Sequence, residues 1–339
     1  MSNNITIKDI ARHFNVSVTT VSKALNGLPG IGSETRDKIT AYALENNYEK
    51  NLSALALKKG KLKTIGVVLP DISEIFFSQA VSGIGLVAKK EGYNVAFMES
   101  HNDPKIEAEN IRQLKSGNVA GIIICLSKLS GYSLDYLQQI QQQGLPVVFF
   151  DRVPHDENFY TVSCDLYNAS QEIVDFLWEN GHYKIGIIRG PQSLYTSLER
   201  MKGFMEGLNK KGHKTNGNLF STTDLSYEGT RKAMKDILSK KEKPTAVVTF
   251  NDYVALDAIK YILEETNMVI NKDIVTVSYG NLLFTKYIEK NKPIASVEQY
   301  PEEQGRHAAK MLISLINHVP LASNKIIIKG KLVKHFEKK

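Results

Sequence analysis

The sequence predicts a small all-α region at the N-terminus, followed by an α/β region that contains two doubly wound parallel sheets. The first 60 residues show apolar residues at helical spacing and no convincing strand. From Thr64 onward, short apolar runs alternate with helical patterns, which is typical of parallel sheets covered on both faces. The 339 residues, 42% of them hydrophobic, are enough for more than one core.

Three short helical patterns occupy the N-terminal region. The apolar residues recur at helical spacing in Ile7–Phe14, in Val18–Leu25 and in Ile39–Asn46. Ser33 is the expected N-cap of the third helix, with Arg36 at position N3. The composition of Asn26–Gly30 predicts a loop between the second and third helices.

The α/β region is predicted from its alternating runs. The expected strands are Ile65–Leu69, Asn94–Met98, Gly121–Leu126, Pro146–Phe150, Lys184–Ile188, Thr245–Phe250 and Asp273–Ser278. The expected helices are Ala80–Glu91, Ile106–Ser116, Ala169–Asn180, Leu198–Lys211, Gly229–Ser239, Ala255–Glu265 and Glu302–Asn317. About ten strands are expected in all, too many for one nucleotide-binding half, so two doubly wound subdomains with a crevice at their strand ends are favoured.

Composition limits the class of protein. The net charge of +7 permits an anionic partner without requiring one, and residues 1–60 hold eight Lys plus Arg against five Asp plus Glu. Cys125 and Cys164 lie in apolar or β-like runs and are expected to be reduced core residues. Met1–Thr6 lacks the apolar core of a signal peptide, and no apolar run approaches the roughly 20 residues of a membrane span. We therefore expect a cytoplasmic protein without membrane contact.

The first two helices have the spacing of a helix-turn-helix. Asn15–Ser17 is the expected turn and Ser17 the expected cap of the second helix, whose N-terminal residues would face the major groove. Val18, Thr19, Thr20 and Lys23 lie on that exposed side, and hydroxyl, methyl and ammonium groups suit base edges. Thr20, Ser22 and Asn26 carry short donors suited to phosphates. Periodicity alone also permits a three-helix protein-binding domain.

Four segments of the head carry a family resemblance. Thr6–Ala11, Asn15–Asn26, Glu34–Ile39 and Asn47–Tyr48 closely resemble the head of LacI/GalR-type repressors. The resemblance implies a sequence-specific transcription regulator, a repressor, in which Val18, Thr19 and Lys23 are the main base readers. Thr6, at the start of the matched motif, is included among the DNA-binding residues.

The Lys-rich linker 49–62 contains an apolar run, Leu52–Leu57, which predicts a helix too short to be stable unless it is docked. The resemblance implies that Leu57 is a wedge that enters the minor groove together with its copy from a second subunit and kinks the duplex. It also implies that Asn51, Ala54 and Lys58 flank the wedge. The chain departs from the family at Lys50, where a proline is usual, and at Leu55, where a basic residue is frequent.

After Lys63 the resemblance is looser and points to a periplasmic-binding-protein-like sensor domain. The expected domains are 1–48, the linker 49–62, and 63–339 for effector binding and dimerisation. The N-subdomain is expected to comprise about 63–164 plus 294–320, and the C-subdomain about 165–293 plus 321–339. The chain would cross between them near Ser163–Leu166, Pro293–Val297 and Val319–Ser323.

The predicted effector site collects residues at strand ends. Aromatic rings can stack on a sugar or base, carboxylates accept hydroxyl protons, and the guanidinium fork of Arg200 binds hydroxyls, carboxylate or phosphate. Arg200 is the strongest single candidate, and core packing is the alternative for Phe76 and Phe77. The expected effector-binding residues are Asp71, Phe76, Phe77, Asp151, Arg152, Thr196, Arg200, Asn251, Asp252 and Tyr279.

The chain differs from the family at the effector site. Gly280 stands where many relatives have an aspartate that binds sugar hydroxyls, so either the ligand has another shape or Asn281 or a water takes over that role. The C-terminal segment Leu332–Phe336 also departs from the family's arginine-containing pattern. A carbohydrate or sugar phosphate is the effector that the resemblance implies, and a purine remains an alternative because of Phe76 and Phe77.

Enzyme classes are disfavoured by the motifs. Gly83–Ala88 superficially fits a dinucleotide fingerprint, but it lies inside a predicted helix rather than directly after a strand. No nucleophile elbow, phosphate loop or zinc spacing is present, so no catalytic residue, metal ligand or cofactor is predicted. A secreted sugar-binding protein is the other alternative. The expected partners are a pseudo-palindromic double-stranded operator, a small-molecule effector and a second copy of the chain; because no leucine heptads are present, a homodimer is favoured over a tetramer.

Overall fold

The computed structural model describes residues 5–48, 62–127, 134–154, 157–212 and 217–335. The chain divides into two compact units, Met1–Leu62 and Lys63–Lys339, which we call the head and the sensor unit. Each unit is described separately below.

The head is a three-helix unit built on one small core. Its helices are α1 (Ile7–His13), α2 (Val18–Leu25) and α3 (Ser33–Glu45). Each helix contributes an aliphatic side chain that is fully excluded from solvent: Ile10, Val21 and Ile39. The predicted apolar spacings are therefore the faces that pack together.

Caps fix the ends of these helices. Ser17 is the N-cap of α2, as predicted, and its hydroxyl accepts a hydrogen bond from the Thr20 amide at 3.0 Å. The prediction that Ser33 caps α3 is wrong, because Gly32 is the N-cap and makes no side-chain bond. The loop before α3 is instead held from inside the helix, where Arg36 donates to the Leu28 carbonyl at 3.1 Å.

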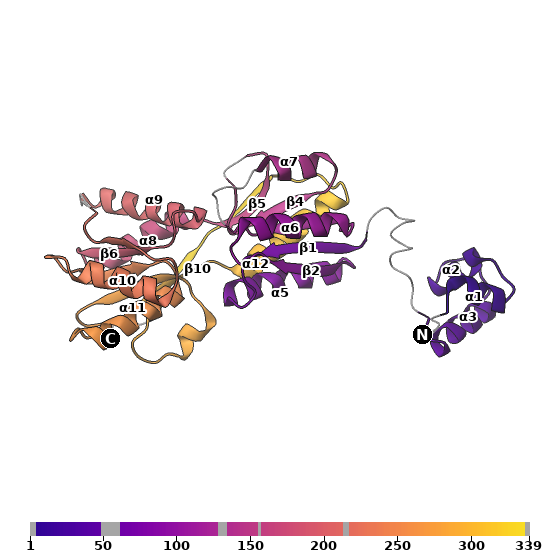
Figure 1. Ribbon diagram of the computed structural model, residues 1–339, viewed down its shortest axis with the longest axis horizontal. Helices are drawn as coiled ribbons and strands as arrows, with labels where there is room; N and C mark the ends of the chain where they lie inside the picture. Colours follow the sequence, from indigo (N-terminus) through magenta and orange to yellow (C-terminus); the bar gives the residue numbers. More distant parts are fainter. Residues whose placement is uncertain (1–4, 49–61, 128–133, 155–156, 213–216, 336–339) are drawn as a thin grey trace. The chain divides into compact units, whose positions relative to one another are not determined.

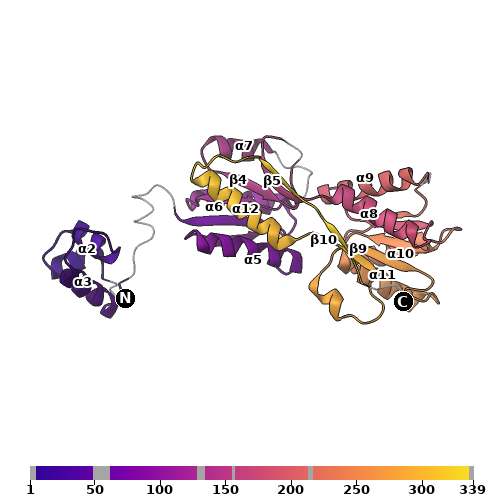
Figure 2. The same cartoon turned by 180° about the vertical axis from the view of Figure 1, so that it is seen from behind.

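The sensor unit contains two six-stranded sheets (Figures 1 and 2). The first has the order β11-β5-β4-β3-β1-β2 and is parallel throughout. Its strands are β1 (Thr64–Leu69), β2 (Asn94–Glu99), β3 (Gly121–Ile124), β4 (Val147–Phe150), β5 (Tyr160–Cys164) and β11 (Lys325–Ile328). In both sheets the strand order reverses beside the first strand, which places a crevice at the carboxyl ends of the strands.

The second sheet has the order β12-β10-β9-β8-β6-β7, and only the β10–β12 pair is antiparallel. Its strands are β6 (Ile185–Arg189), β7 (Phe220–Thr222), β8 (Ala246–Thr249), β9 (Val275–Gly280), β10 (Ala295–Glu298) and β12 (Lys331–Lys334). We call the first sheet with its helices the N-subdomain and the second sheet with its helices the C-subdomain.

Helices cover both faces of each sheet, as continuous apolar strands require. The helices of the N-subdomain are α5 (Ile75–Lys90), α6 (Pro104–Ser116), α7 (Leu134–Gln142) and α12 (Pro301–Ile316). Those of the C-subdomain are α8 (Leu166–Glu179), α9 (Tyr195–Lys210), α10 (Tyr227–Leu238), α11 (Asp252–Glu265) and the short 3₁₀ helix η1 (Leu283–Tyr287). The expected fold class is confirmed.

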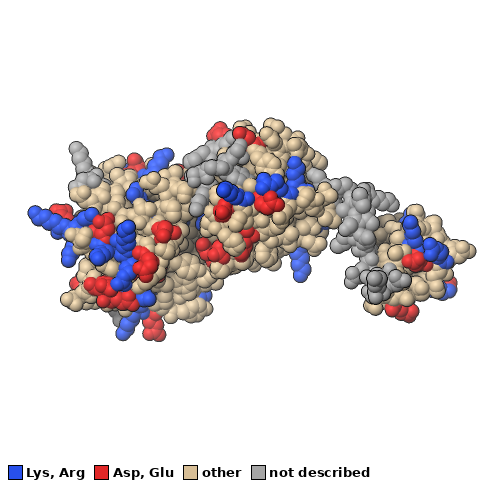
Figure 3. All heavy atoms as spheres, viewed as in Figure 1, with Lys and Arg blue, Asp and Glu red and all other residues tan. Residues whose placement is uncertain are grey.

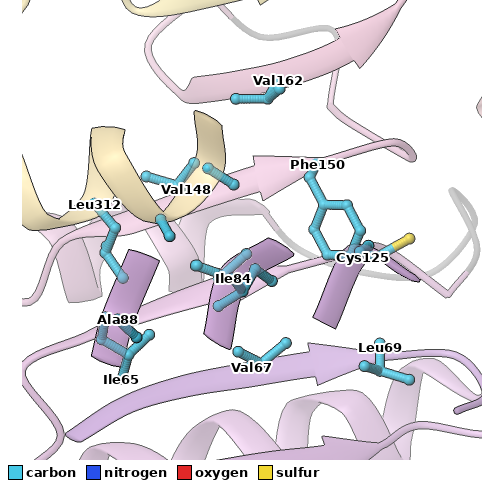
Figure 4. Packing of buried hydrophobic residues seen from close by; sticks show 14 of the residues in the cluster. Ile65, Val67, Leu69, Ile84, Ala88, Cys125, Val148, Phe150, Val162 and Leu312 are labelled. Carbon is cyan, nitrogen blue, oxygen red and sulfur yellow. The ribbon is translucent and has the colours of Figure 1, made fainter. Parts of the chain in front are cut away.

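Successive residues of each strand enter different cores. Ile65 and Val67 of β1 point to the side of α5 and α12, where they pack with Ile84 and Leu312 (Figure 4). Val68, the residue that follows Val67 in the strand, belongs to the core on the side of α6 and α7. This period of two divides the apolar residues of one strand between two buried layers.

Glycine lets α5 and α12 touch backbone to backbone. A Cβ at Gly83 would lie 2.1 Å from the Glu302 carbonyl oxygen, and a Cβ at Gly305 would lie 2.0 Å from that of Ala80. Either side chain would force the helices apart. The glycine pattern in Gly83–Ala88 therefore serves helix packing.

The predicted elements exist, but the predicted helices of the sensor unit begin too late. For example, α5 begins at Ile75 rather than Ala80 and α9 at Tyr195 rather than Leu198. The predicted starts followed the first clear apolar period, whereas the structural starts follow the N-cap. The strands β5, β7, β10, β11 and β12 and the helix α7 were not predicted individually.

The subdomain assignment of the C-terminal strands needs correction. Residues 294–320 were expected in the N-subdomain, yet β10 pairs with β9 of the second sheet. Residues 321–339 were expected in the C-subdomain, yet β11 pairs with β5 of the first sheet. The second and third crossings therefore lie after Glu298 and after Ile328. Short strands carry no local mark of which sheet they will join, because register with a distant neighbour decides it.

Both cysteines are free and buried, as expected. No helix in the described ranges combines the length and apolar composition of a membrane span.

Candidate functional site

The exposed face of α2 is the candidate nucleic-acid surface. Val18 is 41% exposed at the first position of the helix, and Thr19 and Lys23 are also exposed. An isolated aliphatic side chain at the tip of a helix suits contact with a thymine methyl group. On the face of the head shown in Figure 3, basic and acidic side chains both occur.

Other predicted DNA contacts already hold the head together. Thr6 and Asp9 form a capping box at the start of α1, with the Thr6 hydroxyl donating to Asp9 at 2.6 Å. The Thr20 hydroxyl lies 2.9 Å from that of Ser17, and the Asn26 amide donates to the Ser22 carbonyl at 2.7 Å. These bonds fix the orientation of the groups before any partner is present. The predicted linker contacts Asn51, Ala54, Leu57 and Lys58 lie outside the described residues.

The candidate ligand site is a cavity of about 50 Å³ between the two subdomains. Its N-subdomain wall comes from the start of α5 and the end of β4, and its C-subdomain wall comes from α9, α11 and the end of β9. The lining residues are Glu74, Phe76, Phe77, Asp151, Arg152, Thr196, Arg200, Phe250, Asn251, Tyr253, Tyr279, Gly280, Leu282 and Gln299. Since sites for small molecules have volumes of roughly 300–1,000 Å³, a sugar requires these walls to move apart.

Arg200 is the best-defined group in the cavity. Its guanidinium lies between two aromatic rings, 4.3 Å from the centroid of Phe250 and 4.4 Å from that of Tyr279. It donates to the Phe250 carbonyl at 2.6 Å and to Gln299 at 3.1 Å, while its buried Nε has no partner among the described atoms. Burial lowers the pKa of this guanidinium, and the two rings offset part of the cost of burying its charge.

Asp151 and Arg152 turn the chain at the end of β4. Asp151 adopts a left-handed backbone conformation, with φ of 55°, which aims consecutive side chains in different directions. The Arg152 guanidinium donates to Asn102 at 2.6 Å and stands 5.4 Å from the Phe77 ring centroid. Burial raises the pKa of Asp151, while Arg152, whose Nε lies 4.0 Å from the carboxylate, and Arg200 oppose that shift.

Glu74 also lines the cavity, although the sequence did not single it out. It occupies the N-cap position of α5, but its side chain makes no capping bond. Burial raises the pKa of its carboxyl, and Arg152 opposes that shift. The signal available in the sequence was an acidic residue placed just before the Phe76-Phe77 pair.

Gly280 forms a cavity wall with its backbone. Its φ of 122° is unfavourable for residues with a side chain, and a Cβ there would lie 3.3 Å from a carboxylate oxygen of Asp252. An aspartate at this position would be strained and crowded. Asn281 does not replace it at the cavity, because its side chain donates to Glu298 at 2.9 Å and contacts His335.

Asp71 and Asp252 do not line the cavity. Asp71 accepts a hydrogen bond from the Ser73 amide at 2.8 Å. Asp252 is fully buried and accepts bonds from Ser278, from Ser296 at 2.7 Å and from the Leu282 amide at 2.7 Å. It thereby anchors the loop after β9. The remaining predicted effector residues lie together in the cavity wall.

Apolar side chains of the C-subdomain pack against the cores on both sides of the first sheet, and these contacts hold the cavity closed. Leu282, Tyr253 and Phe284 of the C-subdomain pack into the core under α5 and α12. Tyr195, at the start of α9, packs against the core under α6 and α7. Phe250, Tyr253, Leu282 and Gln299 were missed as lining residues because their neighbours in space are distant in sequence.

Comparison with known proteins identifies the family. The family described as "Periplasmic binding proteins and sugar binding domain of LacI family" matches residues 62–337. The chain belongs to the LacI family. The description "Bacterial regulatory proteins, lacI family" matches residues 6–51, which include the whole described head from Thr6. This LacI-family chain is therefore a DNA-binding transcription regulator with an effector-binding domain, and the reading as a secreted binding protein is not favoured.

The matched relatives cover nearly the full chain. The repressor CytR of Escherichia coli (strain K12) is 26% identical over 328 residues, covering 97% of this chain and 94% of the relative. The repressor PurR of Aliivibrio salmonicida (strain LFI1238) is 27% identical over 311 residues, covering 92% of each. The lac repressor dimer bound to operator and the anti-inducer ONPF has a similar fold, with a TM-score of 0.86, 23% identity and 98% coverage of both chains. These relatives are transcriptional regulators rather than enzymes.

Proposed function

We propose that this protein represses transcription as a homodimer on a pseudo-palindromic operator, and that a carbohydrate bound between the subdomains controls its affinity for DNA. The cavity is the observation that carries the effector half of the proposal. It combines aromatic walls with carboxylates and guanidinium groups, the set of side chains that recognises a ring bearing hydroxyl groups. Because its target would be chromosomal DNA, we place the protein in the cytoplasm.

Within the head, Val18, Thr19 and Lys23 read bases, while Thr6, Thr20, Ser22 and Asn26 contact phosphates. Two heads on one operator fit a two-fold symmetric dimer, since each recognition helix serves one half-site. The proposal extends to the linker, where Leu57 is the wedge and Asn51, Ala54 and Lys58 flank it. In the sensor unit, the predicted residues that line the cavity contact the effector, while Asp71 and Asp252 support the walls.

A purine effector is the weaker candidate. Phe76 and Phe77 are buried in the N-subdomain core and pack edge to face, with centroids 5.4 Å apart. The guanidinium of Arg152 lies over the Phe77 ring. In the closed cavity both rings are therefore already engaged in contacts within the protein.

The DNA half is tested on an operator enriched from a random duplex library with the full-length protein. Val18→Ala and Lys23→Ala should each weaken binding to the enriched operator by roughly 1–3 kcal/mol, because each removes a contact to a base edge. Binding to an unrelated duplex should change much less. The measurement is a mobility-shift titration at several salt concentrations.

Lys38→Ala is the matched control. Lys38 is exposed on α3 and pairs with Glu34 at 2.7 Å, so its replacement removes the same charge without touching α2. Equal losses for Lys23→Ala and Lys38→Ala would contradict base reading by α2. The regulator function would be contradicted if no sequence were enriched and if no duplex bound the protein in a salt-dependent manner.

A further inference from the structure

The carboxylates of the cavity accept few hydrogen bonds from the residues that the structure describes. The side chain of Glu74 makes no hydrogen bond with any residue that the structure describes. The nearest donors to the Asp151 carboxylate are the Cys125 thiol and Arg152 Nε, each at 4.0 Å. A buried carboxylate normally accepts several hydrogen bonds, so both groups have unused acceptor capacity where a ligand would lie.

The guanidinium groups of the cavity are partly occupied by protein acceptors. Arg200 donates to Phe250 and Gln299, and Arg152 donates to Asn102 at 2.6 Å and to the Ser127 carbonyl at 3.3 Å. Each guanidinium has five N–H donors, so both retain N–H groups with no acceptor among the described residues, including the buried Nε of Arg200. The cavity thus offers unused carboxylate acceptors and unused N–H donors side by side, which suits hydroxyl groups because they both donate and accept.

The formal charges of the cavity already balance. Glu74 and Asp151 carry two negative charges, and Arg152 and Arg200 carry two positive charges. An anionic ligand would add an uncompensated charge at a site where burial already disfavours the ionised carboxylates. A neutral ligand adds none.

We infer that Glu74, together with Asp151, selects a neutral effector rich in hydroxyl groups and excludes sugar acids and sugar phosphates. Effector hydroxyls donate to the two carboxylates and can accept from the free N–H of Arg200 in the same orientation, because a hydroxyl is both donor and acceptor. Glu74 is the charge filter of the site. The inference rests on the proposed carbohydrate effector and narrows its chemical class.

The first experiment compares matched ligands on the full-length protein by thermal shift and calorimetric titration. The panel pairs neutral sugars (glucose, galactose, xylose, cellobiose) with glucuronate, galacturonate, glucose 6-phosphate and two purines, hypoxanthine and guanine. We expect at least one neutral sugar to raise the midpoint of unfolding, while its acidic and phosphorylated counterparts do not. Tighter binding of an acid or phosphate would overturn the charge filter and leave the carbohydrate effector standing. Binding of purines alone would overturn both.

The second experiment uses Glu74→Gln, which keeps the shape and removes the charge. The affinity for the neutral sugar should fall roughly tenfold or more, because a charge-assisted bond is lost, and discrimination against the matched acid should shrink. Asp71→Asn is the control, since it removes a nearby negative charge that does not line the cavity. Equal affinity in wild type and Glu74→Gln would overturn the inference, even if the effector site itself is confirmed.

A third measurement needs no ligand. Glu74 is partly buried, and its desolvated carboxylate has no donor among the described residues, which costs stability. Glu74→Gln should therefore raise the unfolding midpoint of the ligand-free protein at neutral pH, whereas Asp71→Asn should not. A lower midpoint for Glu74→Gln would show that the carboxylate is satisfied within the protein, which would overturn the inference whichever panel compound binds.

Discussion

Buried charges in the sensor unit are held by oriented dipoles and rings rather than by close ion pairs. Arg200 illustrates this, since its contacts are a backbone carbonyl, an amide oxygen and two aromatic faces. Glu107 is a second case. It is fully buried in α6 and accepts a hydrogen bond from the Ser127 amide at 2.7 Å, while its other oxygen has no described partner. Such groups make stability depend on pH.

The pKa of Glu107 predicts the direction of that dependence. Burial raises it from 4.5 to about 7, against the opposing effects of its hydrogen bonds to Ser127 and of Arg152. At pH values between 4.5 and about 7, Glu107 is therefore protonated in the folded state and ionised in the unfolded state. The corresponding stability is present in full below pH 4.5 and is lost as pH rises through about 7, a change of up to about 3 kcal/mol.

The measurement is the urea midpoint of the sensor unit at pH 5.5 and 7.5. Glu107→Gln should remove this part of the pH dependence, because the amide still accepts from Ser127 and does not titrate. Glu109→Gln, at an exposed position of the same helix, is the control and should keep the slope of the wild type. An unchanged slope in Glu107→Gln would refute the assignment.

At the scale of elements, the loop after β9 connects the two subdomains. Asp252 holds its backbone at Leu282, and the side chain of Leu282 enters the core of the other subdomain. The hydroxyl of Tyr253 also accepts a hydrogen bond from the Ile75 amide at 3.5 Å. The closed cavity is thus stabilised by apolar burial without a ligand, so an effector must compete with these contacts on entry.

Leu282→Ala should loosen this closure. Removing a buried leucine costs roughly 2–5 kcal/mol, here divided between the two subdomains, and shifts the population toward an open cavity. Amides at the start of α5, from Ile75 to Ala80, should exchange faster with deuterium than in the wild type. Leu283→Ala is a neighbouring control, because Leu283 is 51% exposed. Equal exchange in the two variants would show that Leu282 does not close the cavity.

At the scale of the whole molecule, two compact units carry the two sites. The head reads DNA and the sensor unit holds the effector, so regulation requires a free-energy coupling between them. Such couplings typically change affinity by 5- to 150-fold, and the factor must be the same in both directions.

The coupling is measured with the panel compound that binds most tightly. We expect this compound to change operator affinity, and the operator duplex to change the affinity for the compound by an equal factor. The titrations are done with full-length protein, and the Arg200→Ala variant is the control that should lose the effector response while keeping DNA binding. A factor of one in both directions would show that the cavity does not regulate the head.

The head, the α/β class and the family could all be recognised from the order of the amino acids. Ser17 caps α2, and Ile10, Val21 and Ile39 meet in one core, because these interactions are set within a few residues by helical periodicity and capping. Most strands of the sensor unit could likewise be predicted from apolar runs bounded by turns. A strand that is buried on both faces has a continuous apolar sequence, which can be recognised locally.

Other features of the sensor unit come from contacts between residues that are distant in the sequence. The strand β10 joins the second sheet and β11 joins the first, the reverse of the prediction. The sequence of such a short strand does not indicate which neighbour it will pair with. Packing gave Arg200 its place between Phe250 and Tyr279, and it brought Glu74 and Leu282 to one cavity. The backbone of Gly280 forms part of the cavity wall, in a conformation that a residue with a side chain would not readily adopt. Each of these features depends on long-range contacts, and no local pattern encodes them.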